Sequence, residues 1–582
     1  MAGRKEQTLV RQALRRCRRV FRSATVFSAA VNILMLAGPL YMLQIYDRVL
    51  ASHSVPTLLG LTVFVVVAYA FQGVFDIIRG RLMARSARIL DAYLEKAIWQ
   101  LLIGLSIAAR SQKDAVQPAR DLGQLRSFFV SPGPLALMDV PFVPFFLAIC
   151  FLIHPWLGGV ALGGTLLLFA MAFVTERSGR RSAALAAEGA LTRAALIETG
   201  WRNSESIVAL GMTETVAKRW TATNDVFLAA QAHAGDVVGP LQSFSRVIRF
   251  ALQSAILGLG AYLVIYGELT PGAIIAASIM MARALAPIEI ALGNWQAFVA
   301  ARQSYRRLDR VLESAPPTEA ATVLPPPRER LEVRTLTVAP PRGDRPILRS
   351  LDFSLAAGSA MAVIGPSGSG KTSLCRTLLG VWRAAGGSVR LDGASVEHWR
   401  PEDLGRHVGY LAQGIDLFDG TVTDNIARME EKPDSEAVIA AARAAGAHEL
   451  ILRLPGGYDT EVGEAGKVLS AGQRQRIALA RALYRDPFLI VLDEPSANLD
   501  RPGEVALLEA VTRAKQRGAV VVMVAHQPSL TEVCDFVLYV AAGEQKDFGF
   551  RADVLRRVLV QPQPAPPPAA SAKVTPINRG PS

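Results

Sequence analysis

The chain has 582 residues, enough for several domains. Apolar residues make up 51% of it and charged residues only 19%, whereas about a quarter of a soluble protein is charged, so the composition argues against an entirely water-soluble chain and places part of it in lipid. The four cysteines are scattered without a CxxC pair, which gives no sign of a zinc site or a disulfide framework.

Over half of the net charge of +13 lies in the first 22 residues, where eight basic residues face one acid, Glu6. Such a segment either binds nucleic acid or flanks a membrane span on its cytoplasmic side, beside anionic lipids. We favour a cytoplasmic flank over residues 1–25, in contact with membrane lipids, and expect no nucleic-acid partner. The apolar run that follows is longer than the core of a signal peptide, so we expect a retained span.

Six apolar segments follow, each near the ~20 residues that cross a hydrocarbon core as a helix. They are residues 26–49, 56–78, 134–153, 156–174, 247–266 and 272–292. The connections after the second and fourth segments are long and rich in arginine and lysine, whereas the other connections are short and carry neither. Because basic loops stay in the cytoplasm, we expect both termini there. Helical periodicity in ARILDAYLEKAIWQLLIGL predicts that span helices extend well into the cytoplasm.

Several charged residues lie within these ranges, and the most notable are Asp47 in the first, Asp139 in the third, and Arg283 and Glu289 in the sixth. A charge inside a span is a functional-site hypothesis by default. Asp139 lies only about a turn and a half into its span, so a structural role at the interface and a contact with substrate both remain open. Two prolines, at 141 and 144, predict a kink in the same helix.

Composition divides the chain further. We assign residues 26–313 to the membrane domain and the Pro-rich stretch 314–330 to a linker. From 331 to 562, short β-rich runs such as AMAVIG, SVRLDG and FLIVLDE alternate with helices, which is typical of an α/β domain with a mostly parallel sheet. Residues 563–582 are a Pro/Ala-rich tail that we expect to be disordered.

GPSGSGKT follows the apolar run AMAVI and matches the phosphate-loop pattern GxxxxGK[ST]. Glycines let backbone N–H groups wrap phosphates, Lys371 reaches the terminal oxygens, and the Thr372 hydroxyl can ligate Mg²⁺. The predicted nucleotide contacts in this loop are Gly365, Pro366, Ser367, Gly368, Ser369, Gly370, Lys371, Thr372 and Ser373.

Features downstream fit nucleotide hydrolysis. FLIVLDE ends in Asp493 and Glu494, which suit a metal-side carboxylate and a base for the attacking water. LSAGQ, residues 469–473, places Ser470 at the cap of a basic helix, where anions bind. Gln413 and His526 are unremarkable by themselves and gain meaning from their order in the chain.

The order of these features resembles the nucleotide-binding domain of ABC transporters: phosphate loop, Gln413, LSAGQ, Asp493–Glu494, Asp500, His526. The resemblance implies an ATPase with Glu494 as general base, His526 as the γ-phosphate switch, and Lys371 and Gln413 as further catalytic groups. Mg²⁺ would be held by Thr372, Gln413 and Asp493. The residues implied to meet ATP on a partner chain are Ser470, Gly472 and Gln473, beside Asp500 of the D-loop. Residues 460–466, TEVGEAG, resemble the X-loop of exporters.

PLYMLQIYDRVL (39–50) and MDVPFVPFFLAICFLIHPWLG (138–158) resemble the permease/ATPase of bacterial type I secretion systems, specifically the protease/lipase-exporting branch. A transporter of this kind has two nucleotide domains, so one phosphate loop per chain implies a homodimer. The resemblance further implies an inner-membrane location, a periplasmic adaptor, an outer-membrane channel and secreted proteins with a C-terminal signal. A lipid or multidrug exporter, and an ATP-switched regulator without transport, are the alternatives.

Two positions depart from the family pattern. Ala471 stands where a glycine is expected, and would cost about 1 kcal/mol if the position requires φ > 0 or a very close phosphate. In TVAPPRGDRP, no aromatic residue stands at Ala339 or Pro340 to stack on adenine, which leaves the preference for ATP over GTP open.

Overall fold

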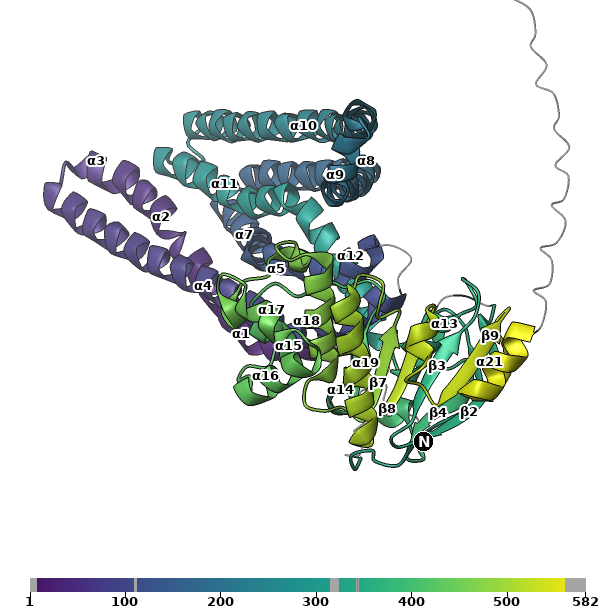
Figure 1. Cartoon of the computed structure of the whole chain (residues 1–582). Helices are drawn as coiled ribbons and strands as arrows, with labels where there is room; N and C mark the ends of the chain where they lie inside the picture. Colours follow the sequence, from purple (N-terminus) through teal and green to yellow (C-terminus); the bar gives the residue numbers. More distant parts are fainter. Residues whose placement is uncertain (1–7, 109–111, 315–323, 342, 344, 561–582) are drawn as a thin grey trace, which may run out of the picture. The chain divides into compact units, whose positions relative to one another are not determined.

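The computed structural model describes residues 8–108, 112–314, 324–341, 343 and 345–560. They divide into two compact units, within Met1–Pro317 and Thr318–Ser582, the first helical and the second built around a sheet (Figure 1). Residues 315–323 of the expected linker at 314–330 lie outside the described residues, and the expected tail at 563–582 lies wholly outside them.

In its described residues, the first unit consists of helices joined by short connections. Its helices are α1 (Leu9–Leu34), α2 (Ala37–Gln44), α3 (Leu50–Ser52), α4 (Val55–Ala108), α5 (Gln112–Val130), α6 (Gly133–Asp139), α7 (Val143–Ile153), α8 (Pro155–Arg202), α9 (Ser204–Ala209), α10 (Thr213–Ile265), α11 (Pro271–Gly293) and α12 (Trp295–Ser314). Within the described ranges, six helical stretches are long and apolar enough to cross a membrane, which confirms the predicted six-helix transmembrane domain.

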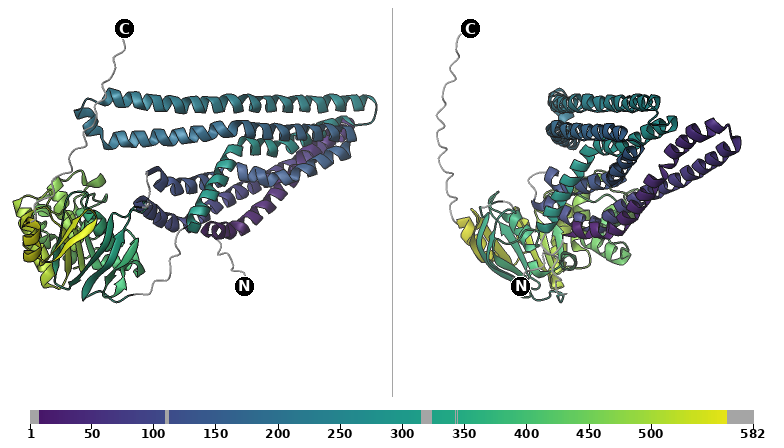
Figure 2. Two further views of the ribbon diagram at one scale, coloured as in Figure 1. Left: turned by 90° about the vertical axis from the view of Figure 1, so that its right-hand side faces the viewer. Right: turned by 180° about the vertical axis from the view of Figure 1, so that it is seen from behind.

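Three helices extend far beyond their apolar runs, as the periodicity of the connecting segments predicts. Helices α4, α8 and α10 contain 54, 48 and 53 residues. Each is therefore about 70–80 Å long, more than twice the thickness of a hydrocarbon core. Helices α8 and α10 lie side by side and are joined by the short helix α9 (Figure 2).

Two spans are broken along their length. In the third span, α6 ends at Asp139, a 3₁₀ turn follows over Val140–Phe142, and α7 begins at Val143, which confirms the kink predicted from the two prolines. The first span is also broken, which was not predicted: α1 ends at Leu34 and α2 begins at Ala37. Pro39 explains it, because its nitrogen cannot donate to the carbonyl four residues earlier. The same span ends in a π-helical turn, η1 (Ile45–Val49).

The N-terminal basic segment is not a free arm in its described part. It is the start of α1, and Val10, Ala13 and Cys17 on one of its faces are buried. Val10 and Ala13 belong to a core cluster that also contains Leu90 of α4 and Leu308 of α12.

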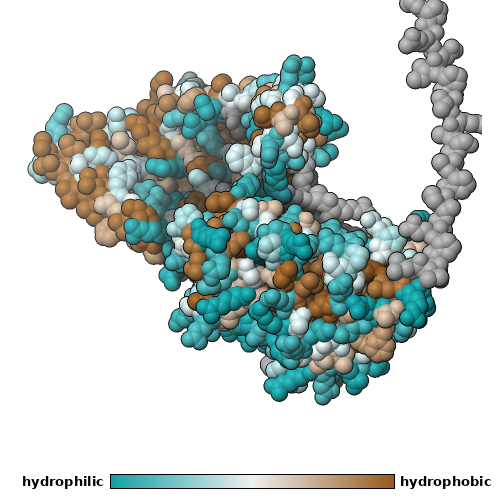
Figure 3. Space-filling view, in the orientation of Figure 1, coloured by the Kyte–Doolittle hydropathy of each residue, from teal (hydrophilic) through white to brown (hydrophobic). Residues whose placement is uncertain are grey.

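Apolar side chains cover much of the surface of the membrane unit. Hydrophobic residues gather over α2, α3 and the start of α4 (Figure 3). Along α4, for example, Val63 and Phe64 are more than 60% exposed. Exposed apolar residues at this density mark a surface that lipid or another protein covers.

The second unit contains a sheet of ten strands in its described residues, in the order β5-β4-β1-β2-β10-β9-β3-β8-β7-β6. The strands are β1 (Arg330–Val338), β2 (Leu348–Ala356), β3 (Ala360–Ile364), β4 (Gly386–Leu391), β5 (Ala394–Ser395), β6 (Val408–Leu411), β7 (Leu489–Asp493), β8 (Val520–Val524), β9 (Phe536–Ala541) and β10 (Glu544–Phe550). The helices are α13 (Lys371–Leu378), α14 (Pro401–His407), α15 (Val422–Ile426), α16 (Ser435–Ala444), α17 (His448–Leu452), α18 (Ala471–Leu483), α19 (Arg501–Gln516), α20 (Pro528–Thr531) and α21 (Arg551–Val560).

The sheet is less uniformly parallel than the sequence analysis predicts. Strands β9, β3, β8, β7 and β6 form a parallel layer. Strands β1, β2, β4 and β5 pair antiparallel, so the run SVRLDG belongs to a separate antiparallel part. Alternation of apolar and polar residues in β2 and β4 fits strands with one covered face, whereas β7 and β8 are buried throughout.

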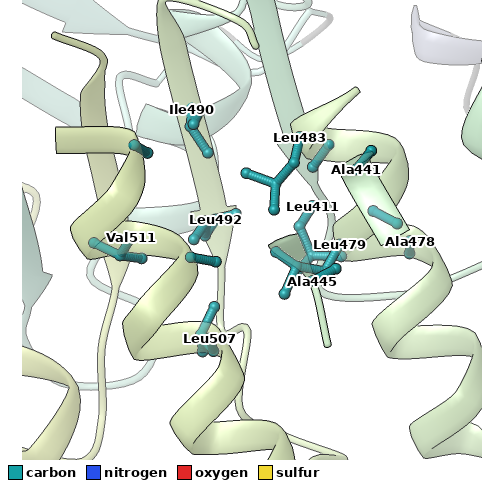
Figure 4. Packing of buried hydrophobic residues seen from close by; sticks show 14 of the residues in the cluster. Leu411, Ala441, Ala445, Ala478, Leu479, Leu483, Ile490, Leu492, Leu507 and Val511 are labelled. Atoms are coloured by element: carbon teal, nitrogen blue, oxygen red, sulfur yellow. The ribbon is translucent and has the colours of Figure 1, made fainter. Parts of the chain in front are cut away.

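The parallel layer is held against its helices by a dry apolar core. Leu479 and Leu483 of α18, Leu507 and Val511 of α19, and Ile490 of β7 point toward one another (Figure 4). This packing fixes the carboxyl ends of β3 and β7, where the phosphate loop and the Asp493–Glu494 pair begin. The α/β part of the predicted fold class is confirmed.

Candidate nucleotide site

The phosphate loop connects β3 directly to α13, as predicted. Gly365 has φ of 152°, and a Cβ there would collide with the carbonyl oxygen of Val540, so the position requires glycine. The Lys371 ammonium donates to the loop carbonyls of Gly365 and Pro366, each at 2.9 Å. Burial lowers the pKa of Lys371, and the charges of Glu494 and Asp493 oppose this shift. The site lysine is thus held inside the loop, facing both predicted carboxylates.

Asp493 ends β7 and is only 1% exposed. Neither of its carboxylate oxygens has a hydrogen-bond partner within the described residues. Burial raises the pKa of the Asp493 carboxyl, the adjacent Glu494 raises it further, and the nearby Thr372 hydroxyl opposes the shift. A buried carboxylate without partners is costly, so this residue is suited to a cation.

The donor set around Asp493 fits Mg²⁺. No group of three or more His, Cys, Asp or Glu side chains suited to a metal occurs among the described residues. Mg²⁺ in nucleotide enzymes needs no such cage, because it takes one or two protein oxygens and completes its shell with phosphate and water. Asp493 with the neighbouring Thr372 hydroxyl provides that minimal set, and Gln413 lies against the adjacent Glu494.

Glu494 is held from two sides. Gln413 Nε2 donates to Glu494 Oε2 at 3.1 Å, and His526 Nε2 lies 3.1 Å from Oε1. Gln413 follows β6 by two residues and His526 follows β8 by two, so adjacent parallel strands bring both to the end of β7. Three predicted catalytic residues therefore meet at one point.

The backbone of Glu494 supports a functional role. Its φ is +53°, a left-handed conformation that is unfavourable for a residue with a Cβ. Such strain persists where the surroundings over-determine it, commonly at active sites. Here the conformation turns the chain out of β7 and directs the carboxylate between Gln413 and His526.

The LSAGQ segment has the predicted cap geometry. Ser470 is the N-cap of α18, and it forms a capping box in which its hydroxyl accepts from Gln473 N at 3.2 Å and its own N–H donates to Gln473 Oε1 at 2.8 Å. A Cβ at Gly472 would lie 3.1 Å from the carbonyl oxygen of Asn498. Within the described residues, no hydrogen bond or ion pair joins Ser470, Gly472 or Gln473 to the phosphate loop of the same chain.

Ala471 is the first residue of α18 and does not have positive φ. The backbone condition under which a methyl group would be costly at this position is therefore not met. The methyl group of Ala471 would then be costly only if a bound phosphate comes very close to it.

Two residues that the sequence analysis missed connect α18 to the segment after Glu494. Gln475, 3% exposed, donates to the carbonyl of Pro495 and accepts from Asn498 Nδ2 at 3.1 Å. Arg476 forms an ion pair with Asp500, which is the N-cap of α19. Their position one turn after Gly472, on the same side of the helix, was the available sequence signal.

The predicted X-loop is anchored to the start of α15. Val462 N donates to the carbonyl of Gly420 at 2.9 Å, and Val422 N donates to that of Thr460 at 3.0 Å. Within the loop, Ala465 has φ of +55°. The segment is therefore an ordered turn held by backbone hydrogen bonds.

Comparison with known proteins gives two family matches. Residues 21–286 match the model of the ABC transporter transmembrane region, and residues 348–497 match the ABC transporter model. The type I secretion system ATP-binding protein PrsD of Rhizobium meliloti (strain 1021) is 47% identical over 547 residues, which cover 94% of each chain. The toxin RTX-I translocation ATP-binding protein of Actinobacillus pleuropneumoniae is 30% identical over 92% of this chain and 76% of its own length.

A solved structure supports the fold. The structure of a bacterial Atm1-family ABC exporter with ATP bound has a TM-score of 0.81 and covers 93% of this chain and 96% of its own. Its sequence identity of 22% limits the likeness to the architecture.

Proposed function

Because this chain belongs to the ABC transporter family, we propose that it works as a homodimer that exports proteins from a bacterial cell by type I secretion. It is a multi-pass membrane transporter and an ATPase. The observation that carries the ATP-driven step is Glu494 held between Gln413 and His526 next to the phosphate loop. The protein cargo is supported by likeness to PrsD along nearly the whole chain.

In the proposed reaction, loop N–H groups and Lys371 bind the phosphates of ATP. Glu494 would orient the attacking water and accept its proton, while His526, which contacts the Glu494 carboxylate, would act as the γ-phosphate switch. Mg²⁺ on Asp493 and Thr372, with Gln413 nearby, would neutralise charge on the phosphate oxygens. Hydrolysis then depends on positioning and charge more than on covalent chemistry.

The homodimer is supported by the cap of α18. Ser470 and Gln473 bind each other at a helix N-terminus, with Gly472 between them, which is a geometry suited to an anion that comes from outside the chain. In the proposal, that anion is the γ-phosphate of ATP on the second copy. Asp500 reaches the same surface through Arg476.

The hairpin of α8 and α10 offers a second argument for a pair. Val208 and Leu210, at its tip, are 74% and 72% exposed. The tip lies about 70 Å along α8 from the other end of that helix, too far to lie in the same bilayer core. Apolar side chains that a single chain exposes outside the membrane are commonly covered by a partner protein in the assembly. In the proposal, a second copy of this chain covers Val208 and Leu210.

The proposed location is the inner membrane, with both termini and the nucleotide unit in the cytoplasm. The start of α1 supports this orientation, because Arg15, Arg18, Arg19 and Arg22 are exposed and have no ion pair within the described residues. Such a cluster beside a span suits the anionic cytoplasmic leaflet. A periplasmic adaptor and an outer-membrane channel complete the proposed export path.

Glu494→Gln tests the proposed ATP hydrolysis. In proteoliposomes, phosphate release is expected to fall by about 10²–10⁴-fold, because the glutamine cannot take the proton, while ATP binding persists. Glu509→Gln, an exposed substitution on α19, is the matched control and should leave the rate unchanged. Retained hydrolysis in Glu494→Gln would remove this residue from the base role.

The cargo is tested in cells. Chromosomal Glu494→Gln is expected to deplete specific proteins from the culture medium, measured by mass spectrometry against the Glu509→Gln strain. An unchanged set of secreted proteins together with altered lipid export or drug resistance would favour a small-molecule exporter instead.

A further inference from the structure

Four charged residues were noted within the apolar spans, and three of them have matched partners. Asp47 accepts from Thr270 Oγ1 at 2.6 Å and from Gly272 N at 2.8 Å, so it caps the start of α11. Glu289 lies 3.2 Å from Arg249 Nε. We interpret these contacts as structural, because Asp47 caps a neighbouring helix and Glu289 is paired with a charge on one.

Asp139 is the third charged residue that has partners. It accepts from Arg79 Nη1 at 2.8 and 3.0 Å and from Asn32 Nδ2 at 2.8 Å. The contacts join α1, α4 and α6. The charge in the third span is therefore neutralised within the unit.

Arg283 is the exception. Its Nη1 lies 3.9 Å from the sulfur of Met35, and no carboxylate within the described residues pairs with it. It is half-buried and stands twelve residues after the start of α11, about 18 Å into a hydrocarbon core of about 30 Å. A charge at that depth faces protein or a water-filled cavity rather than lipid.

Both helices near Arg283 contain a proline that removes a backbone hydrogen bond. Met35 and Leu36 form the break between α1 and α2, and Pro39 cannot donate to the Met35 carbonyl. On α11, Pro287 likewise cannot donate to the carbonyl of Arg283. Each proline leaves one carbonyl without its usual helical donor, and at membrane depth such a group is satisfied by neighbouring protein or by water.

We propose that Arg283, facing the break between α1 and α2, is a carboxylate-binding position on the route of the exported polypeptide. The guanidinium offers a planar pair of donors that matches a carboxylate, so acidic side chains of the cargo are the chemical group it takes in transit. The inference rests on the proposed export function and specifies one contact within it.

Solvent access is tested by labelling the full chain in proteoliposomes with a charged, membrane-impermeant methanethiosulfonate. The four native cysteines are buried, so the unmodified protein serves as background. Arg283→Cys is expected to react at least about tenfold faster than Leu285→Cys, a fully buried neighbour on the same helix. Equal rates at the two positions would overturn the inference.

Binding is tested with a poly-glutamate peptide, with poly-glutamine of the same length as control. Poly-glutamate is expected to change the ATPase rate of the unmodified chain, and Arg283→Gln should raise its half-maximal concentration by about tenfold or more, with Arg283→Lys between the two. The basal rate should stay unchanged, because Arg283 lies outside the nucleotide site.

An absent response in the unmodified chain, or an equal response in Arg283→Gln, would overturn the inference. Neither result would bear on ATP hydrolysis, which Glu494→Gln tests separately. Conversely, if the chain does not export proteins, the Glu494→Gln strain will secrete an unchanged set of proteins, whatever the labelling rates at Arg283→Cys and Leu285→Cys.

Discussion

The membrane unit and the nucleotide unit each bury an aspartate, and the two carboxylates are satisfied in opposite ways. Asp139 is 8% exposed and is bound by Arg79 and Asn32. Asp493 is 1% exposed, and neither of its oxygens has a hydrogen-bond partner within the described residues. The membrane unit thus contains the cation its carboxylate needs, whereas in the proposed mechanism Mg²⁺ would supply that cation to the nucleotide unit.

In the proposed mechanism, this difference separates a structural carboxylate, Asp139, from a functional one, Asp493. Of the two interpretations that the sequence leaves open for Asp139, the ion pair with Arg79 supports the structural one. An unsatisfied carboxylate costs stability, and such a cost is commonly found where a site must bind a ligand.

Arg79→Met should produce the largest effect. Removing the cation leaves Asp139 buried without its charge partner, which is expected to cost about 3–5 kcal/mol and lower the thermal midpoint in detergent. Arg81→Met, at an exposed position on the same helix, is the control and should have little effect. Combining Arg79→Met with Asp139→Leu should recover most of the loss, and a failure to recover would show that the ion pair is not what stabilises these helices.

Asp493→Asn, in contrast, should raise the stability of the nucleotide-free chain. Burial raises the pKa of Asp493, so its charged form opposes folding above its ordinary pKa. The amide is expected to stabilise the protein by about 0.5–2 kcal/mol at neutral pH. This gain should shrink as the pH falls through the raised pKa, because the native carboxyl then becomes neutral in the folded state.

The same substitution should remove stabilisation by ligand. Saturating Mg²⁺–ATP, at about 100 times Kd, is expected to stabilise the unmodified chain by about 2.7 kcal/mol, and Asp493→Asn should lose most of this shift. Asp553→Asn, on the exposed face of α21, provides the control. A full Mg²⁺–ATP shift in Asp493→Asn would mean that this carboxylate does not hold the metal.

Ala471→Gly should have the smallest effect. Ala471 is helical, so glycine relieves no backbone strain, and a cost of at most about 1 kcal/mol is expected for the extra flexibility. ATPase rate and KM should change by less than about twofold, since tenfold would need about 1.4 kcal/mol. A tenfold gain in rate would show that the methyl group obstructs the phosphate of the partner site.

In the nucleotide unit, the end of one strand pointed to Asp493 and Glu494 from the sequence alone, whereas Gln413 and His526 were expected only from their order in the chain and the resemblance to ABC transporters. The run FLIVLDE identifies a buried strand whose last residues, Asp493 and Glu494, must emerge at one edge of a parallel layer. Gln413 and His526 follow neighbouring strands and reach the same edge, where the structure brings both to Glu494. Gln475 and Arg476 were missed because their contacts depend on how α18 packs beside the segment after Glu494.

In the membrane unit, the sequence by itself determined the six apolar helices, their extensions and the kink of the third span, because hydropathy, periodicity and proline act locally. Only the tertiary structure decided which intramembrane charges are satisfied. Arg79 lies 60 residues from Asp139 and Met35 lies 248 residues from Arg283, so no local pattern relates them. A charge is visible in the sequence, but its partner is set by the packing of helices that are distant along the chain, and that packing distinguishes Asp139, which holds the unit together, from Arg283, which we infer meets the cargo.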